Sequence, residues 1–219
     1  MPDGMLVNKG CDGVPELVPV ARSYEIGSMM AALSRRLQGV TGVALLGVGN
    51  RARQDDGAGP AVVRQVKRIA GAVRGLLVVD CGERPEDMLD HVVDARPSSI
   101  LWVDAVDLRE QPGTYFLLEP DQGGAGVLST HRIPIGLISR LMRPRTGADI
   151  AVLGIQIESC ALGAPMSAPV VLSCYNLSLA LSVLFKNWEA GALSGLDGPG
   201  GRRHFSNVPQ LVSWHSSAP

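Results

Sequence analysis

Short apolar runs alternate along the chain with stretches whose apolar residues recur at helical spacing. Five runs predict buried strands, at residues 43–46, 76–79, 99–103, 115–118 and 151–155. Helical spacing predicts helices at 21–39, 60–71, 85–94, 134–142 and 170–188. This alternation favours a mostly parallel sheet with helices on both faces. The 115–118 strand follows a short link, so we expect it to run antiparallel to the 99–103 strand.

The pattern predicts one folded unit with irregular ends. Residues 1–20 carry glycine, proline and polar residues without periodicity, and they indicate an irregular N-terminal arm. Residues 21–189 form a single α/β domain in this interpretation, since no linker divides them. From residue 190 onward glycine, serine and proline dominate, so residues 190–219 are predicted to be a flexible tail.

Composition narrows the classes of function. The chain has 219 residues and a net charge of −1, which gives no basic field for nucleic acid. Its apolar runs fall short of the roughly 20 residues that span a bilayer, so no membrane segment is expected. The N-terminus has no export-signal pattern, and the expected location is the cytoplasm. The four cysteines fit neither a disulfide framework nor a zinc ribbon.

Polar residues follow the predicted strands. Asp55 and Asp56 come after the first strand, Asp80 after the second and Asp104 after the third, and His131 follows a glycine-rich loop. In α/β sheets ligands bind beyond the carboxyl ends of the strands, so we expect these side chains in one crevice. Two carboxylates and an imidazole would make a three-ligand metal site, with imidazole suited to nickel, zinc, copper or iron.

Other interpretations of these residues remain open at this point. Asp56 would also favour or cap the following helix. Asp80 and Asp104 would also serve as turn formers at strand ends, and His131 as a structural hydrogen-bonding residue. Residues 47–52 match the dinucleotide fingerprint G-x-G-x-x-A. Two acids and a helix that starts only at Pro60 argue against a bound pyrophosphate there.

Five motifs occur in a fixed order: GVGNxxxxDDGAGP at 47–60, VVDCGERPED at 78–87, RPSSILWVDAVDLREQPGTYFLLEPD at 96–121, STHRIP at 129–134 and VLGIQ at 152–156. Together they resemble the hydrogenase maturation endopeptidases. They are most similar to the branch that processes the large subunit of formate-hydrogenlyase-type [NiFe] hydrogenase. Two residues depart from the family pattern, because Gln54 and Cys81 stand where glycines are usual.

The resemblance implies a fold, an activity and a site. The fold is a three-layer α/β/α sandwich of the phosphorylase/hydrolase-like kind, with a twisted, mostly parallel five-stranded sheet. The activity is removal of the C-terminal extension from a nickel-loaded [NiFe] hydrogenase large-subunit precursor. Asp56, Asp104 and His131 would be both the nickel-binding and the catalytic residues, while Asp80 and Asn50 would bind substrate.

The resemblance also bears on metal, mechanism and assembly. Nickel would arrive with the precursor, so free metal should bind weakly to the isolated chain, which we expect to be a monomer. The metal would activate the scissile carbonyl or a water, or would only position the substrate while a carboxylate acts as general base. A protein of another class, a non-proteolytic nickel-dependent checkpoint or carrier for the precursor, would use the same three ligands.

Overall fold

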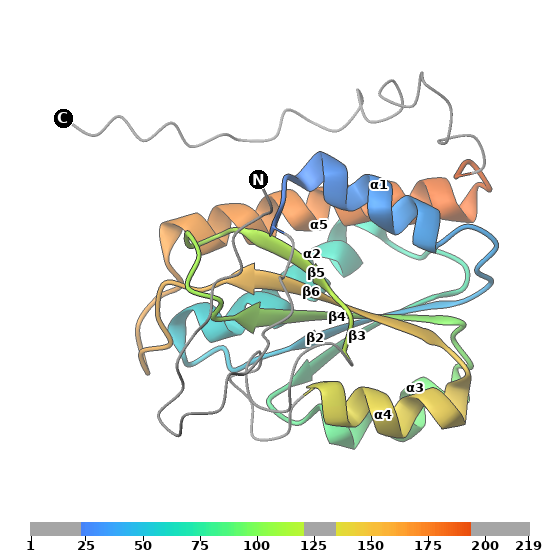
Figure 1. The fold of residues 1–219 in the computed structure, drawn as a ribbon, viewed down its shortest axis with the longest axis horizontal. Helices are drawn as coiled ribbons and strands as arrows, with labels where there is room; N and C mark the ends of the chain where they lie inside the picture. Colours follow the sequence, from blue (N-terminus) through green and yellow to red (C-terminus); the bar gives the residue numbers. More distant parts are fainter. Residues whose placement is uncertain (1–22, 121–134, 194–219) are drawn as a thin grey trace, which may run out of the picture.

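A six-stranded sheet forms the centre of the molecule (Figure 1). The computed structural model describes residues 23–120 and 135–193. Its strands are β1 (Ser23–Tyr24), β2 (Val43–Val48), β3 (Leu76–Gly82), β4 (Ser99–Val106), β5 (Tyr115–Leu118) and β6 (Asp149–Gln156). Its helices are α1 (Ile26–Arg36), α2 (Ala58–Ala70), α3 (Leu89–Asp94), α4 (Ile135–Thr146) and α5 (Ala168–Glu189), with 3₁₀ turns η1 (Gln54–Gly57) and η2 (Pro85–Met88).

The strand order is β1-β5-β6-β4-β2-β3. β2, β3, β4 and β6 are parallel, whereas β5 is antiparallel to β6 and β1 is antiparallel to β5. This confirms the mostly parallel sheet and its five predicted strands. The two-residue β1 at the edge was too short to predict. β5 runs opposite to β4 as expected, but β6 lies between them and supplies its pairing partner.

Two apolar layers hold the helices to the sheet. In Figure 1, α1, α2 and α5 cover one face and α3 and α4 cover the other. β4 contributes to both layers, because successive side chains of a strand point to opposite faces. Leu101 and Val103 pack towards α2 and α5, while Ile100 and Trp102 pack towards α3 and α4. The expected three-layer α/β/α arrangement is therefore confirmed.

Helix α5 corrects the expectation that no segment is long enough to span a bilayer. Its 22 residues meet that requirement by length and composition. However, 56% of its most apolar window is buried inside the protein, and Leu177, Leu181 and Phe185 are fully enclosed. The helix is apolar because it packs between α1, α2 and the sheet, which makes it the core helix of this face.

Several predicted boundaries shift by a few residues. α2 begins at Ala58, two residues before Pro60, and η1 comes before it. The predicted 85–94 helix is divided into η2 and α3. Leu193 packs into the core, so the ordered chain extends past the predicted start of the tail at residue 190. The predicted arm at 1–20, residues 194–219 of the tail and His131 lie outside the described residues.

Candidate active site

Two glycines place the loop after β2 directly on the carboxyl end of the sheet. A Cβ atom on Gly59 would lie 2.3 Å from the carbonyl oxygens of both Val48 and Val103, so only glycine fits there. Gly49 has φ +147° and is equally crowded, because its Cβ would meet the Asp56 carbonyl oxygen. The first turn of α2 therefore rests on β2 and β4, and η1 contacts the end of β4.

Asp56, one of the two acids of η1, is held by a hydrogen bond from the loop that directly follows β2. Its side chain is buried, with 3% of the residue exposed, and its Oδ2 accepts a hydrogen bond of 3.0 Å from the Asn50 backbone N–H. The Asn50 side chain accepts from the Ala52 N–H at 2.7 Å and donates to Glu83. Asn50 therefore fixes the loop that carries Asp56, and its predicted contact with substrate stays a prediction.

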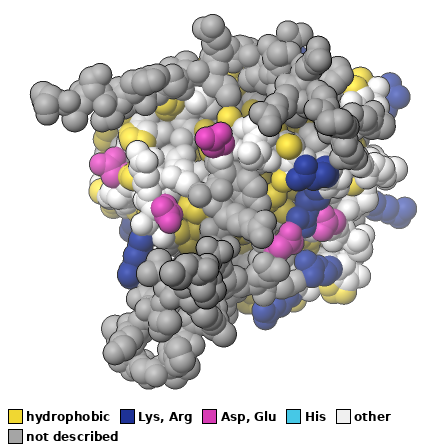
Figure 2. All heavy atoms as spheres, turned by 45° about the horizontal axis from the view of Figure 1, so that its top comes forward, with side chains coloured by type: hydrophobic (Ala, Val, Ile, Leu, Met, Phe, Trp, Pro, Cys, Tyr) yellow, Lys and Arg dark blue, Asp and Glu magenta, His cyan; other side chains and the backbone are white. Residues whose placement is uncertain are grey.

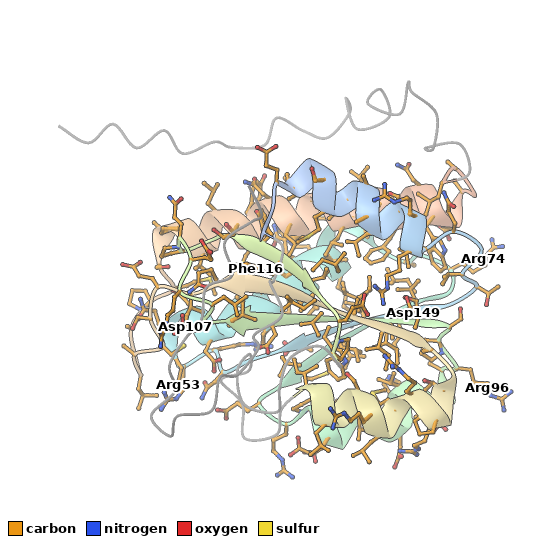
Figure 3. All side chains as sticks on the ribbon, viewed as in Figure 1. Arg53, Arg74, Arg96, Asp107, Phe116 and Asp149 are labelled. Atoms are coloured by element: carbon orange, nitrogen blue, oxygen red, sulfur yellow. The ribbon has the colours of Figure 1, made fainter. Side chains whose placement is uncertain are left out.

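Asp104 is the second buried acid near this edge, with 1% of the residue exposed. It lies inside β4 rather than after it, level with Gly154 of β6. Strand alternation places it in the row of Ile100 and Trp102, on the face of the sheet covered by α3 and α4. Figure 3 shows Asp107, just beyond β4, at the same end of the molecule as Arg53 and opposite Arg74 and Arg96.

Asp80 lies on the other face of the sheet. It follows Val78 in the row of β3 that faces α2, and it is level with Gly47 of β2. Its carboxylate pairs with Arg51, lies 4.0 Å from Nε of Arg64, and accepts a bond from the Gly82 N–H. Asp80 and Asp104 therefore lie on opposite faces of the sheet near its carboxyl edge, and their grouping in one crevice stays a prediction. On the face drawn in Figure 2, basic side chains lie directly beside acidic ones.

Asp55 and Gln156 are polar residues whose roles sequence reasoning missed. Asp55 is fully buried and binds the loop between β6 and α5. Gln156, at the end of β6, accepts a bond from the Leu108 N–H at 2.8 Å and donates to Asp107 at 3.1 Å. It thereby holds the loop that follows the Asp104 strand. The sequence signals that could have indicated these roles were the Asp55-Asp56 doublet and the lone polar residue, Gln156, at the end of an apolar strand.

The described cysteines are poor candidates for a nucleophile. Burial raises the pKa of the Cys81 and Cys174 thiols to about 12. Cys160 is half-buried near η1, and burial together with the charges of Asp56 and Asp55 raises its pKa. A raised pKa lowers the fraction of thiolate, which is the reactive form. The described acids are therefore the better candidates for chemistry.

The described residues contain part of the predicted nickel site. Asp56 and Asp104 both approach the carboxyl edge of the sheet, but the third predicted ligand, His131, lies outside the described ranges. Within those ranges, no group of three histidine, cysteine, aspartate or glutamate residues is arranged to hold a metal ion. The full three-residue assignment therefore stays a prediction.

Comparison with known proteins identifies the family. The model of the hydrogenase maturation protease family matches residues 60–174. The hydrogenase 3 maturation protease of Escherichia coli K12 is 32% identical over 128 residues, which cover 58% of this chain and 80% of that protein. The chain belongs to the hydrogenase maturation protease family. It is therefore a hydrolase of the endopeptidase type, as its motifs predicted.

Solved structures agree with this assignment. The [NiFe] hydrogenase maturation protease from Thermococcus kodakarensis KOD1 superimposes with a TM-score of 0.67 at 26% identity, covering 71% of this chain and 99% of that one. The solution structure of an Escherichia coli endopeptidase gives a TM-score of 0.55 at 27% identity, covering 78% and 97%. Both solved structures thus match over nearly all of their own length and over about three quarters of this chain.

Proposed function

We propose that this hydrogenase maturation protease removes the C-terminal extension of a nickel-loaded [NiFe] hydrogenase large-subunit precursor of the formate-hydrogenlyase type. The observation that carries the proposal is the burial of two carboxylates, Asp56 and Asp104, where η1 meets the end of β4. The Asn50 N–H holds Asp56 in place, and strand pairing fixes the backbone of Asp104 against β6, so both acids are positioned at the edge of the sheet where α/β proteins bind ligands. We assign to them the binding of the metal that the substrate carries.

The nickel belongs to the substrate in this proposal. Asp56 and Asp104 would supply carboxylate oxygens, and His131 would supply the imidazole that nickel favours. Support for His131 comes from the STH motif alone, since the residue lies outside the described ranges. Asp80 and Asn50 would contact the precursor polypeptide. A cytoplasmic location and a monomeric state complete the proposal.

Two chemical routes fit these residues. In one, the substrate's metal polarises the scissile carbonyl or activates a water molecule. In the other, the metal only places the precursor tail, and Asp56 or Asp104 accepts a proton from the attacking water. The two routes differ in what an amide substitution does. An Asp→Asn change leaves an oxygen that can still ligate metal weakly, but it removes the proton acceptor.

The decisive experiment uses nickel-loaded precursor. We expect the purified chain to shorten the loaded large subunit by the mass of its extension, and to leave the nickel-free precursor intact. Mass spectrometry of the large subunit gives the readout. Equal cleavage of both precursor forms would refute recognition through nickel. Binding of the loaded precursor without cleavage would refute the peptidase assignment and favour a checkpoint or carrier.

A further inference from the structure

Asp55 lies beside Asp56 in sequence but is directed into the protein. The residue is 0% exposed, and both of its carboxylate oxygens accept hydrogen bonds. Oδ1 accepts from the Ser167 N–H at 2.7 Å. Oδ2 accepts from the Glu158 N–H at 2.8 Å, the Ser159 N–H at 3.3 Å and the Ser167 hydroxyl at 2.9 Å. All four donors belong to the loop between β6 and α5.

Backbone bonds join the same two segments. The Asp55 N–H donates to the Ser159 carbonyl at 3.3 Å, and the Gly163 N–H donates to the Ala52 carbonyl at 2.7 Å. The Arg53 guanidinium also donates to the Cys160 carbonyl at 3.2 Å. Because Asp55 contributes its backbone and both carboxylate oxygens, it is the centre of this contact between two loops that are about a hundred residues apart.

We propose that Asp55 is a positioning residue, which fixes the η1 turn against the β6–α5 loop and thereby sets the location of the Asp56 carboxylate. The η1 turn has four residues and no side-chain cap. Its first residue, Gln54, has a φ of +42°, which is unfavourable for a residue with a side chain. Such backbone persists where the surrounding structure determines it, and the Asp55 contacts supply that determination.

The geometry requires a carboxylate at this position. Oδ1 faces one donor and Oδ2 faces three, so in either orientation an asparagine amide would place its N–H groups against at least one N–H group. A buried polar group without a hydrogen-bond partner destabilises the folded protein more than an exposed one, because water can bond to the exposed group. The neighbouring Asp56 Oδ2 accepts from the Asn50 N–H, and that proton is an internal reporter of where the Asp56 carboxylate lies.

The test compares Asp55→Asn with Ser167→Ala and with Met142→Ala, a core variant on α4 that is buried on the opposite face of the sheet from α2 and α5. Nitrogen-15 NMR follows the Asn50 amide resonance, and a precursor assay follows processing per folded molecule. We expect Asp55→Asn to shift the Asn50 resonance and to slow processing at least about tenfold, because small displacements of reacting groups are costly in rate. Ser167→Ala should shift the resonance in the same direction by less.

The control separates positioning from stability alone. Met142→Ala should lower the melting temperature while leaving the Asn50 resonance and processing per folded molecule unchanged. An unshifted Asn50 resonance in Asp55→Asn would overturn the proposal, as would the same shift in Met142→Ala. If Asp55→Asn does not fold, an unshifted Ser167→Ala would overturn it. The activity arm rests on the proposed function, whereas the NMR arm decides the positioning role even if wild-type protein processes no precursor.

Discussion

Arg51 donates from its guanidinium to the Asp80 carboxylate, and this ion pair joins the loop after β2 to the end of β3. Arg51 is half-exposed and Asp80 is partly exposed. A second guanidinium, that of Arg64, lies 4.0 Å from the same carboxylate. Asp80 is therefore a charge-paired residue at the rim of the site rather than a free acid within it.

Replacement of Asp80 should affect substrate binding more than folding. Exposed ion pairs contribute about 0–1 kcal/mol, so we expect Asp80→Asn to change the free energy of unfolding by less than about 1 kcal/mol. Because Asp80 is a proposed substrate contact, Asp80→Asn should raise KM for the precursor several-fold and leave kcat unchanged. The control is Asp87→Asn, because Asp87 pairs with Arg84 on an exposed turn. Equal KM values for the two variants would remove Asp80 from the substrate site.

Replacement of Asp104 should abolish most processing while the fold survives. The residue lies inside β4, two residues before the strand ends, and its carboxylate has the proposed task of binding metal or accepting a proton. Loss of such a group typically costs about 100-fold or more in rate. We expect Asp104→Asn to reach this loss with an unfolding transition as cooperative as that of the wild type. Asp107→Asn, three residues further on, is the matched control and should retain activity.

The isolated chain should bind free nickel weakly. Asp56 and Asp104 supply two oxygens, and the remaining coordination positions are proposed to come from His131 and from the precursor. Titration calorimetry with nickel should therefore give an affinity much weaker than nanomolar. A nanomolar Kd would correspond to a binding free energy of about −12 kcal/mol. Nanomolar binding would contradict the substrate-borne metal and would favour a metal carrier. The Asp56→Asn variant serves as the reference for any weak heat observed.

Replacing Gln54 with glycine should stabilise the folded protein. The φ of +42° at Gln54 lies in the left-handed region, which costs a residue with a Cβ roughly 1–2 kcal/mol. Relief of this strain by glycine is offset by about 0.4–1 kcal/mol, because glycine gives the unfolded chain more conformational entropy to lose on folding. We therefore expect Gln54→Gly to stabilise the protein by about 0.5–1 kcal/mol in denaturant unfolding. Gln54→Ala keeps the Cβ and should give no such gain, so equal stability of the two variants would contradict the strain.

Stability should fall in alkaline solution. Burial raises the pKa of the Cys81 and Cys174 thiols from 9.0 to about 12, and that of the Tyr115 hydroxyl from 10.0 to about 12. Between these values the unfolded chain loses protons that the folded protein keeps, so the free energy of unfolding decreases as pH rises from about 9 towards 12. Denaturant unfolding at several pH values measures this slope. Cys174→Ser should make the slope shallower, and an unchanged slope would refute the contribution of this thiol.

The sequence predicted the sheet and the helices because their burial follows simple periods. It did not predict that Asp80 and Asp104 would lie on opposite faces. An aspartate after an apolar run resembles a strand end, since buried carboxylates are rare. β3 and β4 instead continue through Asp80 and Asp104 to Gly82 and Val106. Once an acid lies inside a strand, the two-residue alternation of side chains decides which face of the sheet it occupies. A predicted strand that ends a few residues too early leaves the acid outside the strand and so gives no prediction of its face.

The role of Asp55 was beyond sequence reasoning for a different reason. Its four donors come from residues 158–167, and the contact exists only after β2 and β6 have both paired with β4 and aligned the two loops. Local pattern contains no information about partners so far apart. The departure at Gln54, in contrast, was visible in the motif, and the structure gives it a physical meaning as strained backbone.

Helix α5 has a consequence for how the chain reaches its native state. This helix supplies the central part of the apolar layer over α1 and α2, yet it comes from the last quarter of the sequence. Because chains emerge from the ribosome with the N-terminus first, this side of the nascent sheet has only α1 and α2 to cover it until α5 has been made. α3 and α4 are available earlier for the other side. Newly made chains are thus most prone to aggregate through the surface that α5 finally closes.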